Sequence, residues 1–465
     1  MFALWVRAMN ALQANRIGWL MLASCLGLAL GLAHAEQPPR PNLVVILTDD
    51  HGYGDVSMYG RRDVLTPNID SLASAGMLFK NMRANCTVCS PTRAALLTGR
   101  YPDRVGVPGV IRTHAENSWG YFRPGVATLA DQLKAVGYAT AIVGKWHLGL
   151  ESPNTPNERG FEFFHGFLGD MMDNYRTHLR HDLNYMRRNA DAIEPQGHAT
   201  DLFTDWAIEY VKRQALNDPH RPFFLYLAYN APHFPIEPPA AALERVRRRD
   251  PQLPEARAKN VAFVEYLDDG IGRVLQALDE TGLRDNTLVV FTADNGGSLP
   301  HAQSNHPWRD GKQSHYDGGL RVPFAIRWPA KVKAGSASDY AGLVFDLFPT
   351  CLELAGAELP SGLDAISLAP LLDGGAIDGE RDLYFVRREG GPAYGGNSYE
   401  ALIRGRWKLL RNSPYQPLEL YDLSLDPLEM IDLATEQPQV VNQLSAALRE
   451  RIRAGGSIPW QPPGE

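Results

Sequence analysis

The 465-residue chain is poor in cysteine and in positive charge, and each shortage excludes a class of protein. Of its four cysteines only three follow residue 35, and no further Cys or His pairs stand at the spacing of a zinc site. A formal net charge of −7 argues against the clustered basic surface that binds nucleic acid, so no nucleic-acid partner is expected. An anionic substrate would therefore have to be held by a local group of cations.

Long apolar runs are missing after residue 35, and one such run lies before it. Arg7 and Arg16 flank Trp19–Leu32, and Ala33-His34-Ala35 resembles an A-x-A cleavage site. We therefore predict a signal peptide over residues 1–35 and an exported protein, periplasmic or secreted, with no other membrane contact. A retained anchor and lipid attachment at Cys25 are weaker alternatives, because the run is short for a span and continues past the cysteine.

Four apolar segments run directly into polar residues. Residues 42–48 lead to Asp49 and Asp50, 140–143 to Lys145 and His147, 223–229 to His233, and 287–292 to Asp294 and Asn295. Helical segments lie between them, and the clearest is Asn260–Thr281, where apolar residues recur at three- and four-residue steps. This alternation predicts an α/β fold with a large mixed, mostly parallel sheet sandwiched by helices. Because strand carboxyl ends line the ligand crevice of such sheets, we expect these polar residues to form one site.

The pattern changes after about residue 375. Short strand-like segments follow at Leu383–Val386, Ala401–Ile403, Trp407–Leu410 and Leu418–Leu423, with a tight hairpin at Arg404-Gly405-Arg406 and a helix over Pro438–Ile452. We predict a catalytic domain over residues 36–375 and an α+β subdomain over 376–465, formed by a small antiparallel sheet and a terminal helix.

Cys89 opens a predicted helix, since Pro91 suits a first turn and Ala94–Leu97 are good helix formers. A group at Cys89 would face free backbone N–H groups and the positive end of the helix dipole, which favours an anionic oxygen there. Arg93 lies one turn further on and can reach the same place. The Cys86-x-x-Cys89 spacing alone leaves a redox pair or half a zinc site as alternatives.

The segment N-C-T-V-C-S-P-T-R-A-A-L-L-T-G-R, residues 85–100, resembles the signature of the type I sulfatases of the alkaline phosphatase superfamily. Five more motifs occur in this family's order: P-N-L-V-V-I-L-T-D-D-H-G-Y-G-D (41–55), G-K-W-H-L-G (144–149), A-P-H-F-P (231–235), A-D-N-G-G (293–297) and G-G-L-R-V-P (318–323). The resemblance covers nearly the whole chain after residue 35. It implies an alkaline phosphatase-like fold and a hydrolase of sulfate esters, of a sulfated carbohydrate or an aryl sulfate.

The resemblance also implies roles for individual residues. A formylglycine-generating enzyme would oxidise Cys89 to formylglycine, whose hydrated aldehyde is the nucleophile. Arg93, Lys145, His233 and Lys312 would surround the sulfate and stabilise its developing charge. Asp294 would be the base for the first attack, and His147 the base that lets the sulfated intermediate release sulfate. His233 or Lys312 would protonate the leaving alcohol.

A divalent cation is expected beside the nucleophile. The set Asp49, Asp50, Asp294 and Asn295, with the modified Cys89, offers hard oxygen ligands that suit Ca²⁺ or Mg²⁺ better than zinc, and the resemblance favours Ca²⁺.

Some positions depart from the family pattern. His51 replaces a frequent apolar residue and is either a substrate contact or a tolerated variant, and Asp173 or Asn174 stands where some relatives carry a serine that contacts formylglycine. Substrate specificity is expected from residues 112–123, 170–193 and 300–317. In the second of these loops, Arg176, Arg180, Arg187 and Arg188 would contact a polyanionic sugar or form a solvated basic face.

The sequence leaves two other functions open. A phosphonate monoester or phosphodiester hydrolase could use the same formylglycine, and only relative rates on sulfate and phosphate esters would separate it from a sulfatase. A non-catalytic relative that binds sulfated glycans would lack formylglycine and turnover.

Overall fold

The computed structural model describes residues 40–389 and 397–463, so the predicted signal peptide and Cys25 lie outside the described residues. From Pro41 onward the chain forms one compact unit. Within the described ranges, no helix combines the length and the apolar character needed to cross a bilayer.

A ten-stranded sheet forms the centre of the fold, in the order β13-β2-β12-β11-β1-β10-β4-β5-β8-β9. The four strands predicted from the sequence are adjacent and parallel: β11 (Thr287–Ala293), β1 (Asn42–Thr48), β10 (Phe223–Ala228) and β4 (Ala139–Lys145). Parallel β5 (Phe163–Phe167) follows β4, then antiparallel β8 (Met186–Arg188) and β9 (Asp191–Ala192). On the other side, β12 (Phe324–Arg327) is antiparallel to both β11 and β2 (Met77–Phe79), and β13 (Ser336–Ser338) is parallel to β2. The predicted mixed, mostly parallel sheet is confirmed.

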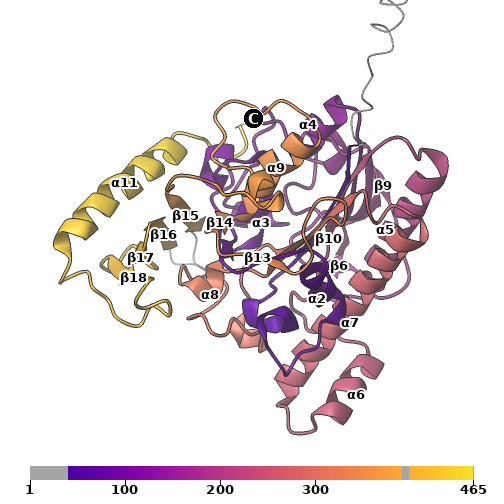
Figure 1. The fold of residues 1–465 in the computed structure, drawn as a ribbon, viewed down its shortest axis with the longest axis horizontal. Helices are drawn as coiled ribbons and strands as arrows, with labels where there is room; N and C mark the ends of the chain where they lie inside the picture. The colour runs from indigo at the N-terminus through magenta and orange to yellow at the C-terminus, as the bar shows by residue number, and fades with distance from the viewer. Residues whose placement is uncertain (1–39, 390–396, 464–465) are drawn as a thin grey trace, which may run out of the picture. The chain divides into compact units, whose positions relative to one another are not determined.

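Helices cover both faces of this sheet, which explains why its central strands read as continuous apolar runs. Along β1, Leu43, Val45 and Leu47 belong to a core shared with α3 (Cys89–Thr98), α4 (Leu129–Ala135) and α9 (Leu347–Leu354). Val44 and Ile46 face the opposite core, with α2 (Pro67–Ser74), α5 (Ala199–Asn217) and α7 (Glu255–Glu280). Helices α5 and α7 lie side by side, and α6 (Ala240–Arg249) packs on α7 (Figure 1).

A separate four-stranded antiparallel sheet follows, as predicted. It consists of β15 (Leu383–Glu389), β16 (Asn397–Arg404), β17 (Trp407–Arg411) and β18 (Glu419–Asp422), paired in chain order. The hairpin between β16 and β17 turns at Gly405 and Arg406, where Gly405 has φ 56°. Helix α11 (Pro438–Gly456) lies beside this sheet (Figure 1). Its Leu444 and Leu448 belong to the apolar core that the sheet residues form.

A buried ion network joins the small sheet to the rest of the unit. Lys408 of β17 contacts Asp317 at 2.8 Å and Glu429 at 2.6 Å, and Arg83 contacts Asp317 at 2.6 Å. All four side chains are at most 2% exposed. Buried ions of this kind are stable only when each charge has a partner, so the network depends on every one of its members.

The remaining elements are short. The strands are β3 (Met82–Arg83), β6 (Leu179–Arg180), β7 (Leu183–Asn184) and β14 (Gly342–Leu343), and the helices are α8 (Asp317–Leu320) and α10 (Ala369–Leu372). The 3-10 helices are η1 (Tyr53–Asp55), η2 (Ser57–Tyr59), η3 (Pro102–Val105), η4 (Ala115–Asn117), η5 (Pro156–Arg159), η6 (Leu299–His301) and η7 (Val344–Asp346).

Candidate active site

Cys89 is the first residue of α3, as predicted from the sequence. Its side chain is 3% exposed, and the preceding Val88 is extended, so the helix begins abruptly at the cysteine. No side chain caps this helix start, which leaves its first backbone N–H groups facing the site. Gly99 ends the helix in the left-handed conformation.

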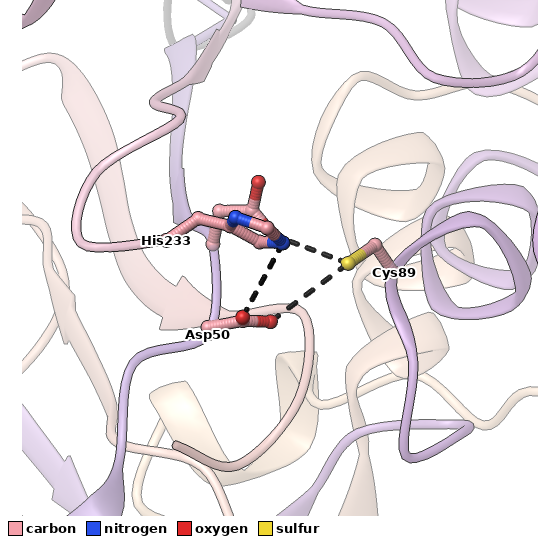
Figure 2. A group of neighbouring side chains, drawn as sticks. Asp50, Cys89 and His233 are labelled. Atoms are coloured by element: carbon pink, nitrogen blue, oxygen red, sulfur yellow. Dashed lines mark hydrogen bonds and ion pairs between the residues drawn. The ribbon is translucent and has the colours of Figure 1, made fainter. Parts of the chain in front are cut away.

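The Cys89 thiol lies against two aspartates and a lysine. It donates to Oδ1 of Asp49 at 3.2 Å, and lies 3.9 Å from Oδ1 of Asp50 and 4.0 Å from Nζ of Lys312. Figure 2 shows Cys89, Asp50 and His233 converging from three different segments. Burial, and then the charges of Asp294 and Asp49, raise the pKa of the thiol well above its usual value. The unmodified cysteine is therefore protonated and a weak nucleophile.

The other two cysteines do not engage Cys89. Cys86 is buried and turns its thiol to the carbonyl of Val386, at 3.3 Å, and the described cysteines are all unpaired. Cys86 and Cys89 therefore form no disulfide with each other.

Lys145 and Asp49 form a fully buried ion pair at the carboxyl ends of two strands that β10 separates. Nζ of Lys145, the last residue of β4, lies 2.5 Å from Oδ2 of Asp49, which directly follows β1. Burial alone would raise the pKa of Asp49, but Lys145, followed by His233 and Arg93, holds it well below the usual value. Asp49 is therefore ionised with its Oδ1 turned to Cys89.

Arg93 binds Asp294 with two nitrogens, Nε at 3.0 Å and Nη2 at 2.7 Å from Oδ2. The second oxygen of Asp294 accepts the backbone N–H of Asp50 at 3.2 Å. Burial and the nearby charge of Asp49 raise the pKa of Asp294 to about 7, although Arg93 and Lys145 oppose the rise. Both oxygens of the predicted base are thus engaged, and the carboxylate in contact with the thiol is that of Asp49.

Asp50 is held in a left-handed conformation, with φ 57°, that points its carboxylate into the site. Oδ1 accepts from Nδ2 of Asn295 at 2.9 Å, and Oδ2 lies 2.6 Å from Nζ of Lys312. Close packing of two glycine motifs supports this arrangement, since a Cβ on Gly296 would lie 2.0 Å from the carbonyl oxygen of Gly318. Oδ1 of Asn295 is buried and has no hydrogen-bond partner within the described part of the chain.

His147 has the left-handed φ of 60° and lines the cavity beside Cys89. Its Nε2 lies 2.8 Å from the carbonyl of Ile111, whereas Nδ1 is buried and finds no hydrogen-bond partner in the ranges that the structure describes. Burial, followed by the charges of Lys145 and Arg93, lowers the pKa of His147 well below its usual value. The ring is therefore neutral, donates from Nε2 and keeps a lone pair on Nδ1.

The cavity beside Cys89 has a volume of about 280 Å³. Besides Cys89, His147, His233 and Lys312, its lining includes Arg112, Asp170, Arg180, Phe234, His301 and Arg387. Phe234 stacks between His233 and His301, with ring centroids 4.3 and 4.2 Å away. Phe234 adjoins a motif histidine and could have been suspected, but no sequence signal pointed to Arg387.

The structure bears on two points that the sequence leaves open about the cavity lining. His51 is fully buried, contacts the carbonyl of Asp55 at 3.1 Å and packs edge-on to Phe291, so it does not reach the cavity. Asp173 binds Arg180 and Asn174 binds Glu237, and neither lines the cavity.

Of the four arginines for which the sequence leaves a substrate contact or a solvated face open, Arg180 alone lines this cavity. Arg187 donates to the backbone carbonyls of Asn184 and Met186, while Arg176 lines a separate surface pocket with Glu237. Arg188 is exposed at the end of β8.

The predicted cation ligands partly coincide with a metal-competent group. Ligand atoms of Asp49, Asp50, Cys89 and His233 all lie within 4.8 Å of one another, whereas Asp294 is turned toward Arg93. The three buried carboxylates at positions 49, 50 and 294 are balanced by Arg93, Lys145 and Lys312. An incoming sulfate ester would add negative charge, which one further bound cation would balance.

Comparison with known proteins places this geometry in a family. The family model described as Sulfatase matches residues 41–357, and that described as "N-sulphoglucosamine sulphohydrolase, C-terminal" matches residues 304–455. The chain belongs to the sulfatase family. It is a sulfuric ester hydrolase of the alkaline phosphatase superfamily.

Similar proteins support the same assignment over most of this sulfatase. It is 34% identical to the N-acetylgalactosamine-6-sulfatase of Sus scrofa, over 84% of this chain and 75% of that protein. It is 32% identical to the arylsulfatase A of Homo sapiens, over 94% of this chain and 92% of that protein. The solved structure of Ps i-CgsB in complex with k-i-k-neocarrahexaose matches with a TM-score of 0.82 and 30% identity, covering 90% of this chain and 93% of that one.

Proposed function

We propose that this sulfatase removes sulfate from a sulfated carbohydrate, with a formylglycine derived from Cys89 as its nucleophile. The observation that carries the proposal is the position of Cys89 at an uncapped helix start, within 4.0 Å of Asp49, Asp50 and Lys312 and beside a cavity. The sulfur stands in for the oxygen of the hydrated aldehyde. The raised pKa of the thiol supports the need for modification, because an unmodified cysteine would remain protonated.

Of the predicted sulfate-binding cations, Lys312 lines the cavity beside Cys89, whereas Lys145 and Arg93 are buried against Asp49 and Asp294. Lys145, Lys312 and Arg93 are each anchored by a carboxylate, so their positions are set before substrate arrives. Such pre-placed charges stabilise developing negative charge by about 3–4 kcal/mol each in sites that exclude water.

Two residues would accept protons during the reaction, and a third would donate one. Asp294 would take the proton of the attacking hydroxyl through Oδ1, the oxygen that Arg93 does not bind, and Lys312 would give one to the leaving alcohol. The second hydroxyl at residue 89 would give its proton to Nδ1 of neutral His147. The lone pair of this nitrogen has no other partner among the described residues.

The donor set fits a calcium ion, with magnesium as the alternative. Asp49 and Asp50 offer carboxylate oxygens, and rotation of the Asn295 amide would present the oxygen that now lacks a partner. Asp294 would join this set by its Oδ1, which faces Asp50. When bound, such an ion polarises a sulfate oxygen and lowers the pKa of the hydroxyl at residue 89. Calcium should raise the melting temperature, and the Asp50→Asn variant should show a smaller rise.

The substrate class is inferred from relatives. One is named an N-acetylgalactosamine-6-sulfatase, and another was solved with k-i-k-neocarrahexaose. We further propose export, with cleavage of residues 1–35, and modification of Cys89 by a formylglycine-generating enzyme during maturation.

Release of sulfate tests the proposal directly. Purified enzyme is assayed on sulfated sugars, on 4-nitrophenyl sulfate and on the matching phosphate esters, alongside the Cys89→Ala variant. We expect sulfate release that exceeds phosphate release and that Cys89→Ala abolishes. Full turnover by the variant would overturn the nucleophile, and faster phosphate release would overturn the substrate class.

A further inference from the structure

A second cavity adjoins the one beside Cys89 and shares three lining residues with it. Arg112, Asp170 and Arg180 line both the first cavity and a neighbouring cavity of about 250 Å³. Neither alone reaches the roughly 300–1,000 Å³ of a typical small-molecule site, whereas their summed volume does. We propose that the second cavity is a subsite for another sugar ring, which makes a sulfated oligosaccharide the preferred substrate over a sulfated monosaccharide. This inference rests on the proposed sulfatase function.

The charged side chains that line both cavities already have partners of opposite charge. Arg180 donates to Asp170 at 3.0 Å and to Asp173 at 2.7 Å, while Arg112 lies 3.2 Å from Glu389. A second sulfate entering here would meet Asp170 as well as the arginines. Paired guanidinium and carboxylate groups place donors beside acceptors, which matches sugar hydroxyls because each hydroxyl both donates and accepts. The subsite therefore fits the hydroxyls of a ring rather than a second sulfate.

The far end of the second cavity is formed by the tip of the hairpin between β6 and β7. Its two turn residues, His181 and Asp182, both have positive φ, at 50° and 60°. Such a turn is normally made by Asn-Gly or Asp-Gly, because a side chain is strained in this conformation. His181 lines the cavity, so the strained position delivers an imidazole to it.

A second imidazole faces His181 from another loop. The rings of His114 and His181 have centroids 4.6 Å apart at an interplanar angle of 43°. Asn117 and Thr113 complete this end, and the Thr113 hydroxyl is buried with no hydrogen-bond partner among the described residues. Ring faces for the C–H surface of a sugar thus stand beside donors and acceptors for its hydroxyls.

The test compares three substrates that differ in how far they extend. They are 4-nitrophenyl sulfate, a sulfated monosaccharide, and an oligosaccharide that contains the same sulfated sugar. For the unaltered enzyme we expect kcat/KM to be higher on the oligosaccharide than on the monosaccharide. In the His181→Gly variant, kcat/KM should fall about tenfold on the oligosaccharide, as expected for one lost hydrogen bond. It should stay unchanged on the aryl sulfate. Its melting temperature should stay level or rise, because glycine adopts the turn without strain.

Asp182→Gly is the matched control. This variant removes backbone strain from the same turn, but Asp182 does not line the cavity. Its kcat/KM on the oligosaccharide should therefore be unchanged. Asn117→Ala tests the subsite from the opposite loop, should His181→Gly fold poorly. Equal kcat/KM on oligosaccharide and monosaccharide, or full oligosaccharide activity in both His181→Gly and Asn117→Ala, would overturn the subsite. Absence of sulfate release from all three substrates would instead overturn the proposed function.

Discussion

Nζ of Lys312 lies 3.1 Å from Nε2 of His233, and Nδ1 of His233 lies 2.6 Å from the carbonyl oxygen of Phe234. An ammonium group can only donate, so Nε2 accepts and the proton of the ring is on Nδ1. Burial lowers the pKa of His233 to about 4, with Lys312 contributing, which agrees with a neutral ring. Of the two predicted acids, Lys312 is therefore the one that holds a proton facing the substrate.

This assignment predicts a dependence on the leaving group. Lys312→Ala should lower kcat by about 10²–10⁴-fold on alkyl or sugar sulfates, whose alcohols need a proton as they leave. The loss should be much smaller on 4-nitrophenyl sulfate, whose leaving phenolate is stable. The measurement is kcat across aryl and alkyl sulfates of graded leaving-group pKa. Lys331→Ala, which removes an exposed lysine paired with Asp373, serves as control. Equal losses on all leaving groups would assign the acid to another residue.

Modification of Cys89 can be read from one tryptic peptide. Cleavage after Arg83 and Arg93 gives residues 84–93, which contain both Cys86 and Cys89. After alkylation we expect one alkylated cysteine, at Cys86, and an aldehyde at residue 89 that reacts with a hydrazide. Cys86 is the internal control for complete alkylation, because both thiols share the peptide. Two alkylated cysteines in fully active enzyme would refute formylglycine and leave the family assignment intact.

The Lys145–Asp49 pair predicts a stability effect that reverses in a double variant. Lys145→Met leaves the Asp49 carboxylate buried without its nearest cation, which should cost about 3–5 kcal/mol of unfolding free energy. Adding Asp49→Asn removes the stranded charge and should restore most of this loss, while activity stays absent in both variants. Denaturant unfolding measures the stability. Lys331→Met should cost about 0–1 kcal/mol, because that pair is exposed. A single variant as stable as the parent would show that Asp49 does not depend on Lys145.

His198 predicts how stability depends on pH. Its Nδ1 accepts the N–H of Thr200 at the start of α5, and its Nε2 lies 3.1 Å from the carbonyl of Glu237. Protonation of Nδ1 would break the first contact, whereas Nε2 donates in either state, and burial lowers the pKa of the ring to about 4. Since the unfolded ring titrates near 6.5, unfolded chains bind a proton that folded chains do not, and stability falls as pH drops from about 6.5 to 4.

The His198→Asn variant isolates this effect, because asparagine can cap α5 and does not titrate. Relative to it, the parent should lose up to about 3 kcal/mol of unfolding free energy over this pH range. Melting temperatures measured at several pH values provide the test. Exposed His220→Asn should follow the parent at every pH. Parallel curves for the parent and His198→Asn would contradict the role of His198.

The sequence predicted the elements that are buried and the residues that follow them. Strand β1 matches the predicted bounds because its continuous apolar run has one explanation, burial on both faces. Helix α7 begins at Glu255, five residues before the predicted start, because its first turn is polar and carries no apolar periodicity.

The cavity walls were less predictable. Arg387 lies in a strand of the small sheet, and nothing in its local sequence distinguishes it from a surface arginine. The neutral ring of His233 depends on Lys312, 79 positions away, and on the depth of burial. Both are products of tertiary packing, which local patterns do not record.

Strand β15 has a consequence for how such enzymes diversify. Its Arg387 lines the Cys89 cavity, and its Glu389 binds Arg112, which lines both cavities. A chain cut at residue 375 would therefore lose part of its substrate-binding wall as well as the buried lysine that fastens the small sheet. Grafting the C-terminal segment of one relative onto another should therefore transfer part of the substrate preference, because the segment carries part of the cavity wall.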